Sequence, residues 1–181
     1  MNYIIVDLEA TCWKERSDTR PNEIIEIGAL KIDQAGKTIS EFNALVKPKL
    51  HPVLSDFCTE LTSIQQADID QAKSFDAALV DFQNWIDLSK PYLLCSWGFY
   101  DKTQFAKDCD LYEISKIWLI KHISLKHQYG AFKKLPRPIG MTAALQMEGI
   151  ELAGTHHRAI DDAKNIAKIF NANRGKWNTD Y

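Results

Sequence analysis

Two carboxylates on one face of a buried strand constrain this chain more than any other feature. A strand is expected over residues 3–9, where a mostly β-branched apolar run leads into Asp7 and Glu9. Alternate side chains of a strand point to the same face, so these two carboxylates project together. Holding like charges so close is costly unless a cation lies between them, and hard cations such as Mg²⁺ prefer oxygen ligands. The strand therefore predicts half of a metal site.

The length and composition of the chain indicate one globular domain spanning residues 1–181. The net charge of -2 gives no overall attraction to nucleic acid or acidic membranes, although a local basic groove stays compatible with it. The four cysteines have neither metal-ligand nor redox-motif spacing, which favours reduced thiols. Neither a signal peptide nor a membrane-spanning run is recognisable. We therefore expect a cytoplasmic protein without a membrane partner.

The order of the expected strands and helices indicates an α/β fold. Three strands with short connections predict an antiparallel meander, and the later alternation of strands and helices adds parallel strands to the same mixed sheet, with helices on both faces. Strands are expected over residues 3–9, 23–32, 38–47, 92–97 and 117–120, the last with a competing helical interpretation. Helices are expected over residues 63–71, 74–88, 101–111, 125–132, 142–147 and 158–172.

The last expected helix contributes a third carboxylate. On a period of 3.6 residues, Asp162 neighbours Ile166 and Ile169 at the edge of the buried face, whereas Asp161 lies on the polar face. A carboxylate beside an apolar face needs a partner. The cation predicted at the first strand would supply it, so Asp162 is the expected ligand.

A histidine and a fourth acidic residue stand next to these elements. His157 lies in the loop before the last helix, where it can ligate a metal or act as general base on water, and its spacing to Asp162 favours this over a structural role. His156 is expected to be a solvent-side or structural neighbour. Asp101 begins a helix, so a helix cap and a metal ligand are both open, and its position alone favours the cap.

Three motifs in order resemble the DEDDh exonucleases, the DnaQ-like branch of the ribonuclease H-like superfamily. They lie at residues 7–11, 96–101 and 157–162, and the resemblance covers nearly the whole chain. Segments 54–62 and 161–167 are similar to the subfamily of ERI-1, the three-prime histone mRNA exonuclease and KapD-like proteins. In its animal members a tryptophan directly precedes the aspartate of the second motif. Here three residues separate the two, a form that resembles stand-alone bacterial members.

The resemblance implies a ribonuclease H-like fold and a reaction. Asp7, Glu9, Asp101 and Asp162 would hold two divalent metal ions, Mg²⁺ or Mn²⁺. His157 would be the general base, and Glu9 would also contact the terminal 3′ hydroxyl. The protein would then be a metal-dependent 3′–5′ exonuclease that releases nucleoside 5′-monophosphates from the 3′ ends of single-stranded RNA or DNA.

Substrate contacts are expected from residues near the first two motifs and the subfamily segment, namely Ala10, Thr11, Trp13, Trp97, Leu54 and Phe57. A tryptophan that stacks on a base contributes about 1–3 kcal/mol, but core packing is an equal alternative for both tryptophans. A small basic cluster of Lys133, Lys134 and Arg137 could contact phosphates or simply form a solvated loop.

Two other classes of protein remain as alternatives to an enzyme. One is a non-catalytic nucleic-acid-binding module that keeps the same fold. The other is an interaction protein whose acidic pairs are solvated surface groups. The presence of all four carboxylates together with His157 favours the enzyme, because a decayed site would usually lose one of them.

Overall fold

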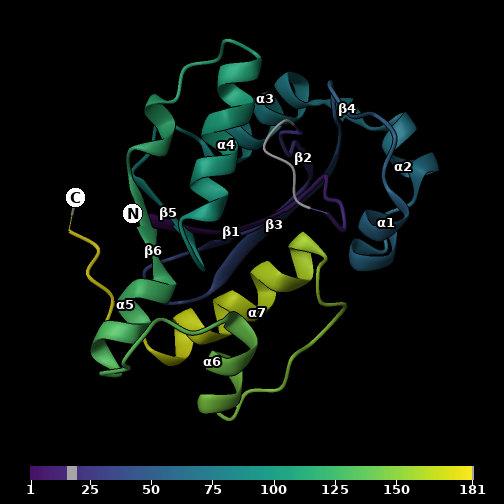
Figure 1. Ribbon diagram of the computed structural model, residues 1–181. Helices are drawn as coiled ribbons and strands as arrows, with labels where there is room; N and C mark the ends of the chain where they lie inside the picture. Colours follow the sequence, from purple (N-terminus) through teal and green to yellow (C-terminus); the bar gives the residue numbers. More distant parts are fainter. Residues whose placement is uncertain (16–19, 181) are drawn as a thin grey trace.

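A six-stranded mixed sheet organises residues 1–15 and 20–180, which are the residues that the computed structural model describes (Figure 1). The strands follow the spatial order β4-β3-β2-β1-β5-β6. Their bounds are β1 Asn2–Ala10, β2 Ile24–Ile32, β3 Thr38–Lys47, β4 Lys73–Ser74, β5 Tyr92–Ser96 and β6 His122–Ser124. The two central strands of the site, β1 and β5, therefore lie side by side although about 80 residues separate them in the chain.

Helices cover both faces of this sheet. Their bounds are α1 Asp56–Thr62, α2 Gln66–Gln71, α3 Phe75–Ile86, α4 Tyr100–Leu111, α5 Leu125–Phe132, α6 Met141–Met147 and α7 Ala159–Ala172, with a 3₁₀ turn, η1, at Ile117–Leu119. Within the residues described, no helix has both the length and the apolar character needed to pass through a lipid bilayer. In Figure 1, α5, α6 and α7 lie together on one side of the sheet, and α3 and α4 lie on the other.

The strand directions confirm the predicted meander. Strand β1 pairs antiparallel with β2, and β2 pairs antiparallel with β3. Strand β5 then runs parallel to β1, and β6 runs parallel to β5. The C-terminal ends of β1, β5 and β6 consequently meet at one edge of the sheet, which is where open α/β sheets bind ligands.

The alternation of side chains along β1 separates two cores. Ile4, Val6 and Leu8 pack with residues of α3 and α4, whereas Ile5 packs with residues of α5, α6 and α7. Each strand position faces opposite to the next, so Asp7 belongs to the same face as Ile5. The two carboxylates of β1 are thereby directed towards the side that α7 covers.

Two of the expected elements differ in the structure. The strand expected at 117–120 is wrong: Trp118 and Leu119 are buried while Ile117 and Ile120 are exposed, so the segment lacks the alternation of a strand and forms η1. The last strand, β6, begins at His122, two residues beyond the end of the expected segment, and pairs Leu94 with His122.

The helix expected over 63–71 is shorter than expected and is preceded by another. Ser63 has a φ of 62° and ends α1, so the second helix begins only at Gln66. Helix α1 was not expected, although Ser55 carried a signal for it. The Ser55 side chain accepts a hydrogen bond from the amide of Cys58, as a helix N-cap does.

Candidate metal centre and active site

The four expected carboxylates line one cavity of about 310 Å³ at the C-terminal edge of β1 and β5. Asp7 and Glu9 come from the end of β1, Asp101 from the first turn of α4 and Asp162 from the first turn of α7. Three of these side chains are almost inaccessible, since Glu9 is 8 % exposed and Asp101 and Asp162 are each 5 % exposed. Burial of Asp162 confirms the inward orientation that the helix period predicted.

Three of these carboxylates fit a divalent cation. Asp7, Glu9 and Asp162 each offer an oxygen atom, and the three atoms lie within 4.8 Å of one another. Oxygen donors this close repel one another in the absence of a cation, and oxygen is the donor that Mg²⁺ and Mn²⁺ favour. Asp101 lines the same cavity and completes a set of four donors.

The electrostatics of the cavity agree with a cation site. Burial raises the pKa of Asp7 well above its usual range, and the charge of Asp101 raises it further. Burial, followed by the charge of Asp162, raises the pKa of Glu9 to about 8. Burial also raises the pKa of Asp101 to about 6. Without a cation these groups therefore resist ionisation, and a bound cation would stabilise their charged forms.

A glycine in β2 lets α7 reach this cavity. Gly28 pairs with Asp7 across the β1–β2 ladder. A Cβ atom at Gly28 would lie 2.2 Å from the carbonyl carbon of Ala159 and from the amide nitrogen of Ile160. The first turn of α7 therefore rests directly on the backbone of β2, and this close contact brings Asp162 beside the carboxylates of β1.

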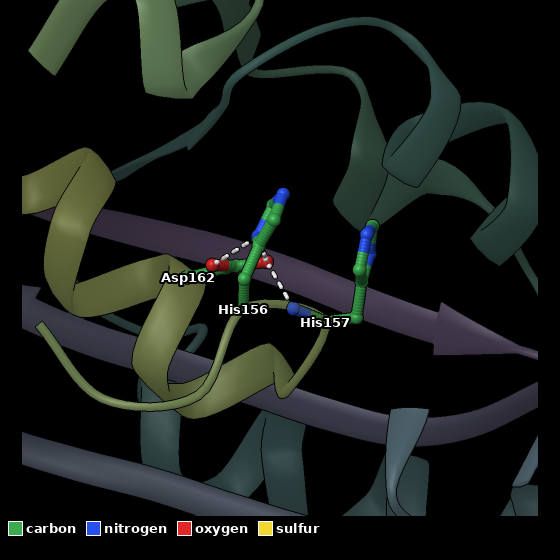
Figure 2. Close-up of side chains that lie close together, drawn as sticks. All are labelled: His156, His157 and Asp162. Carbon is green, nitrogen blue, oxygen red and sulfur yellow. Dashed lines mark hydrogen bonds and ion pairs between the residues drawn. The ribbon is translucent and has the colours of Figure 1, made fainter. Parts of the chain in front are cut away.

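Two adjacent histidines face the cavity from the loop before α7 (Figure 2). A ring nitrogen of His156, Nδ1, lies 3.0 Å from Oδ2 of Asp162, and the backbone amide of His157 donates to the same oxygen at 3.0 Å. The two rings stack with their centroids 4.0 Å apart. His157 has a φ of 65°, a left-handed conformation that turns the loop into the helix.

The pKa of His157 is lowered, first by burial and then by the neighbouring His156. A lowered pKa keeps the imidazole neutral at neutral pH, which is the form that accepts a proton. His157 also lines the cavity, and its role as a general base stays a prediction. His156, 43 % exposed at its side chain, contacts the carboxylate of Asp162 more directly than the sequence suggested.

The residues expected at the substrate lie in different surroundings. Trp97 lines the cavity but is also packed, since its Nε1 donates to the carbonyl of Ile139 at 3.1 Å. Trp13 is half-buried outside the cavity lining and meets the ring of His51 edge-on, with centroids 5.0 Å apart. Both tryptophans therefore have structural contacts, and only Trp97 reaches the cavity.

The other expected contacts surround the end of β1. Ala10 and Thr11 are buried there, and the Thr11 hydroxyl accepts a hydrogen bond from the amide of Glu23. Leu54 is buried in a small core beneath α1, whereas Phe57 is 37 % exposed on that helix. None of these four belongs to the cavity lining among the residues described.

One residue of the basic cluster of Lys133, Lys134 and Arg137 makes contacts within the protein. Lys133 forms an ion pair with Glu148, with 2.6 Å between Nζ and Oε1, and its ammonium lies 5.5 Å from the centroid of the Tyr129 ring. These contacts give Lys133 a structural role and favour the interpretation of this segment as a loop over that of a phosphate site.

The cavity also contains residues that sequence reasoning missed, namely Tyr100, Lys126, Met141 and His156. Tyr100 directly precedes Asp101, so its position was available from the motif. Lys126 and Met141 carried no such signal, because they reach the cavity only through the packing of α5 and α6 on the sheet.

The chain belongs to the exonuclease family, because the family model described as Exonuclease matches residues 4–170. It is 36% identical over 189 residues to ERI1 exoribonuclease 2 of Mus musculus, an alignment that covers 92% of this chain and 27% of that protein. It is 33% identical to the human 3′-5′ exoribonuclease 1, with 93% of this chain and 51% of that protein covered. The chain thus spans about a quarter to a half of the length of these relatives.

The fold agrees with this assignment. The nuclease domain of 3′hExo, a DEDDh family member bound to rAMP, superimposes with a TM-score of 0.92. The two are 28% identical in sequence, and the comparison covers 99% of this chain and 96% of that domain. The α/β fold with a mixed sheet is therefore that of the DEDDh exonucleases, and membership of this family implies a site for divalent metal ions.

Proposed function

We propose that this chain is a metal-dependent 3′–5′ exonuclease that releases nucleoside 5′-monophosphates from single-stranded 3′ ends. One observation carries the proposal: Asp7, Glu9 and Asp162 place oxygen atoms within 4.8 Å of one another, beside His157, in a chain of the exonuclease family. The name of the human relative, an exoribonuclease, and the rAMP bound to 3′hExo support RNA as a substrate. DNA ends are the second substrate to test.

Asp7, Glu9, Asp101 and Asp162 would hold two divalent ions, Mg²⁺ or Mn²⁺. When bound, the ions supply positive charge to the attacking and leaving oxygens of the phosphodiester, where negative charge accumulates in the transition state. The chain's contribution is to place four carboxylates from β1, α4 and α7 around one cavity and to shield three of them, Glu9, Asp101 and Asp162, from bulk water.

His157 would remove the proton from the attacking water molecule. The water oxygen forms a bond to phosphorus while the bond from phosphorus to the 3′ oxygen of the preceding nucleotide breaks. That 3′ oxygen takes up a proton and becomes the new end of the strand, and the released nucleotide keeps the phosphate. Because the pKa of His157 is lowered, its imidazole is ready to accept the proton at neutral pH.

The terminal nucleotide would occupy the cavity. Glu9 would contact its 3′ hydroxyl, and Trp97, which lines the wall, would lie against the base or sugar. Ala10, Thr11, Trp13, Leu54 and Phe57 would shape the approach around the end of β1 and α1. Trp97 and Leu54 also belong to the hydrophobic cores, so in these two residues packing and substrate contact would be combined.

Degradation of end-labelled oligonucleotides tests the proposal. Matched single-stranded RNA and DNA, labelled at the 5′ end, should shorten stepwise with Mg²⁺ or Mn²⁺ and stay intact with EDTA. Asp7→Asn should abolish cleavage because it removes a ligand charge. Asp68→Asn is the matched control, since Asp68 is an exposed carboxylate on α2.

Two results would contradict the proposal. If Asp7→Asn cleaves at the wild-type rate, the carboxylates do not form the working metal site. If the wild-type protein binds Mn²⁺ and oligonucleotide but cleaves neither RNA nor DNA, the chain is a non-catalytic nucleic-acid-binding module.

A further inference from the structure

Lys126 gives the acidic cavity one fixed positive charge. It stands in the first turn of α5, where its amide donates to the carbonyl of Trp97 at 2.7 Å, and its half-buried side chain lines the cavity with Asp7 and Asp162. In the described part of the chain, no other lysine and no arginine belongs to this lining. The ammonium of Lys126 has no hydrogen-bond or ion-pair partner among the described residues, whereas Lys133, which follows the C-terminal end of α5, is paired with Glu148.

An exposed pair of rings adjoins this lysine at the rim of the cavity. The rings of Phe99 and His127 lie with centroids 4.7 Å apart at an angle of 33°, and Phe99 is 53 % exposed. Nδ1 of His127 lies 2.6 Å from the hydroxyl of Ser124, which holds the ring in place. Both neighbours of Phe99 in the chain line the cavity, and His127 directly follows Lys126, so the ring pair stands immediately outside the cavity.

The position of these groups matters because a nucleic-acid strand whose 3′ end lies in the cavity must pass over the rim of the cavity to reach solvent. If the terminal nucleotide fills the cavity, the next nucleotide lies across the rim. The phosphate of this next nucleotide would then pass close to the four carboxylates. Two divalent ions would neutralise these carboxylates but leave no positive charge over for the phosphate. A free ammonium offsets that phosphate, and an exposed aromatic ring offers a face on which any base can stack.

We propose that Lys126 and the Phe99–His127 pair form a subsite for the nucleotide on the 5′ side of the cleaved bond. Lys126 binds the 5′ phosphate of that nucleotide, and Phe99 stacks on its base. This inference rests on the proposed exonuclease function and extends it to a second nucleotide. The subsite is expected to tolerate any base, since neither a ring face nor a point charge distinguishes one base from another.

Two substrates of different length separate this subsite from the catalytic centre. The p-nitrophenyl ester of thymidine 5′-monophosphate carries a terminal nucleotide and a cleavable phosphate ester but no upstream nucleotide. An oligothymidylate carries the terminal nucleotide, the cleavable phosphate ester and the upstream nucleotide. Phe99→Ala and Lys126→Met should each raise KM for the oligonucleotide about tenfold. For Phe99→Ala, which lies outside the cavity lining, kcat/KM for the ester should change less than about twofold. For Lys126→Met, which lines the cavity, kcat/KM for the ester should fall by a clearly smaller factor than for the oligonucleotide.

Two control variants separate the effect of the positive charge from the effect of its position. Lys126→Arg should keep most of the oligonucleotide affinity, because it keeps the charge. Lys37→Met removes an exposed lysine at the β2–β3 turn, at the opposite end of the sheet, and should leave both substrates unaffected. In Lys126→Met, the slope of log KM against log salt should fall by about 0.7, the contribution of one phosphate contact on a single strand.

Three outcomes overturn the inference. Unchanged oligonucleotide kinetics in both Phe99→Ala and Lys126→Met would mean that no second nucleotide is bound there. An equal loss on the ester and the oligonucleotide would place Lys126 at the cleaved phosphate or in a structural role. A salt slope unchanged by Lys126→Met would exclude a phosphate contact. Failure of the proposed function is distinct from these, because the wild-type protein would then cleave neither these two substrates nor a single-stranded RNA.

Discussion

Arg158 binds both carboxylate oxygens of Glu26, with 2.9 Å between Nη2 and Oε1 and 3.1 Å between Nε and Oε2. Glu26 is completely buried, and it also accepts a hydrogen bond from the amide of Ala159. It lies opposite Glu9 in the β1–β2 ladder. Because Arg158 stands between the proposed base and the first turn of α7, this ion pair ties that turn to the strand beside the metal centre.

Glu26→Gln should destabilise the protein by about 2–3 kcal/mol, because it leaves the Arg158 guanidinium with a weakened partner in a largely buried place. The free energy of unfolding from urea titration measures this. Glu41→Gln is the matched control: its ion pair with Lys164 has side chains 49% and 40% exposed, so a change of about 0–1 kcal/mol is expected. Equal effects of the two substitutions would show that the buried pair does not hold α7 in place.

Gly28→Ala should lower both stability and metal affinity. The added methyl group would lie 2.2 Å from the backbone of Ala159, so α7 must move away from β2 and carry Asp162 with it. Gly140→Ala is the control, since nothing lies within 4 Å of its Cβ position. Thermal unfolding with and without Mn²⁺ separates the two effects. A variant at Gly28 with wild-type stability and wild-type Mn²⁺ response would refute the role given to this close contact.

Much of the site follows from local periodicity, which the sequence displays. The spacing of two along a strand places Asp7 and Glu9 on one face, and the helix period turns Asp162 inward; neither inference needs long-range information. The meander and the alternation of strands and helices were predictable for the same reason. Asp101 was ambiguous, because an acidic residue at the start of α4 also suits the helix dipole.

The features of the site that the sequence did not predict depend on packing between segments that are distant in the chain. Nothing near Lys126 in the chain indicates that α5 would bring it to the cavity formed by β1 and α7. Gly28 has an ordinary place in a strand, and only the approach of Ala159 gives it a function. The sequence around Trp118 predicted a strand because it contains a short apolar run. In the structure this run forms a 3₁₀ turn, and its two adjacent residues Trp118 and Leu119 are buried in the core.

His157→Ala should reduce kcat on an oligonucleotide by about 10²–10⁴-fold, the range for loss of a general base, while Mn²⁺ still stabilises the protein. His156→Ala should cost less, because this residue contacts Asp162 and is not the assigned proton acceptor. Single-turnover cleavage and thermal unfolding with Mn²⁺ give the two readouts. A larger loss of rate in His156→Ala than in His157→Ala would reverse the assignment of the base.

The stabilising effect of Mn²⁺ should increase with pH. In the metal-free protein the pKa of Glu9 is raised to about 8 and that of Asp101 to about 6, both above the values in an unfolded chain. The folded state therefore binds more protons than the unfolded state between about pH 4 and pH 8, so the stability of the metal-free protein falls as the pH rises through this window. Metal binding needs ionised carboxylates, so Mn²⁺ restores more stability at the upper end of the window than at the lower end.

Thermal unfolding with EDTA and with Mn²⁺, at several pH values from about 5 to 8, measures this difference in Tm. Glu9→Gln removes the group with the pKa of about 8 and should flatten the metal-free curve in its upper half. Asp68→Asn, at an exposed position, should leave both curves as they are. A Tm difference that stays constant over the whole range would mean that the raised pKa values and the metal site do not belong to the same carboxylates.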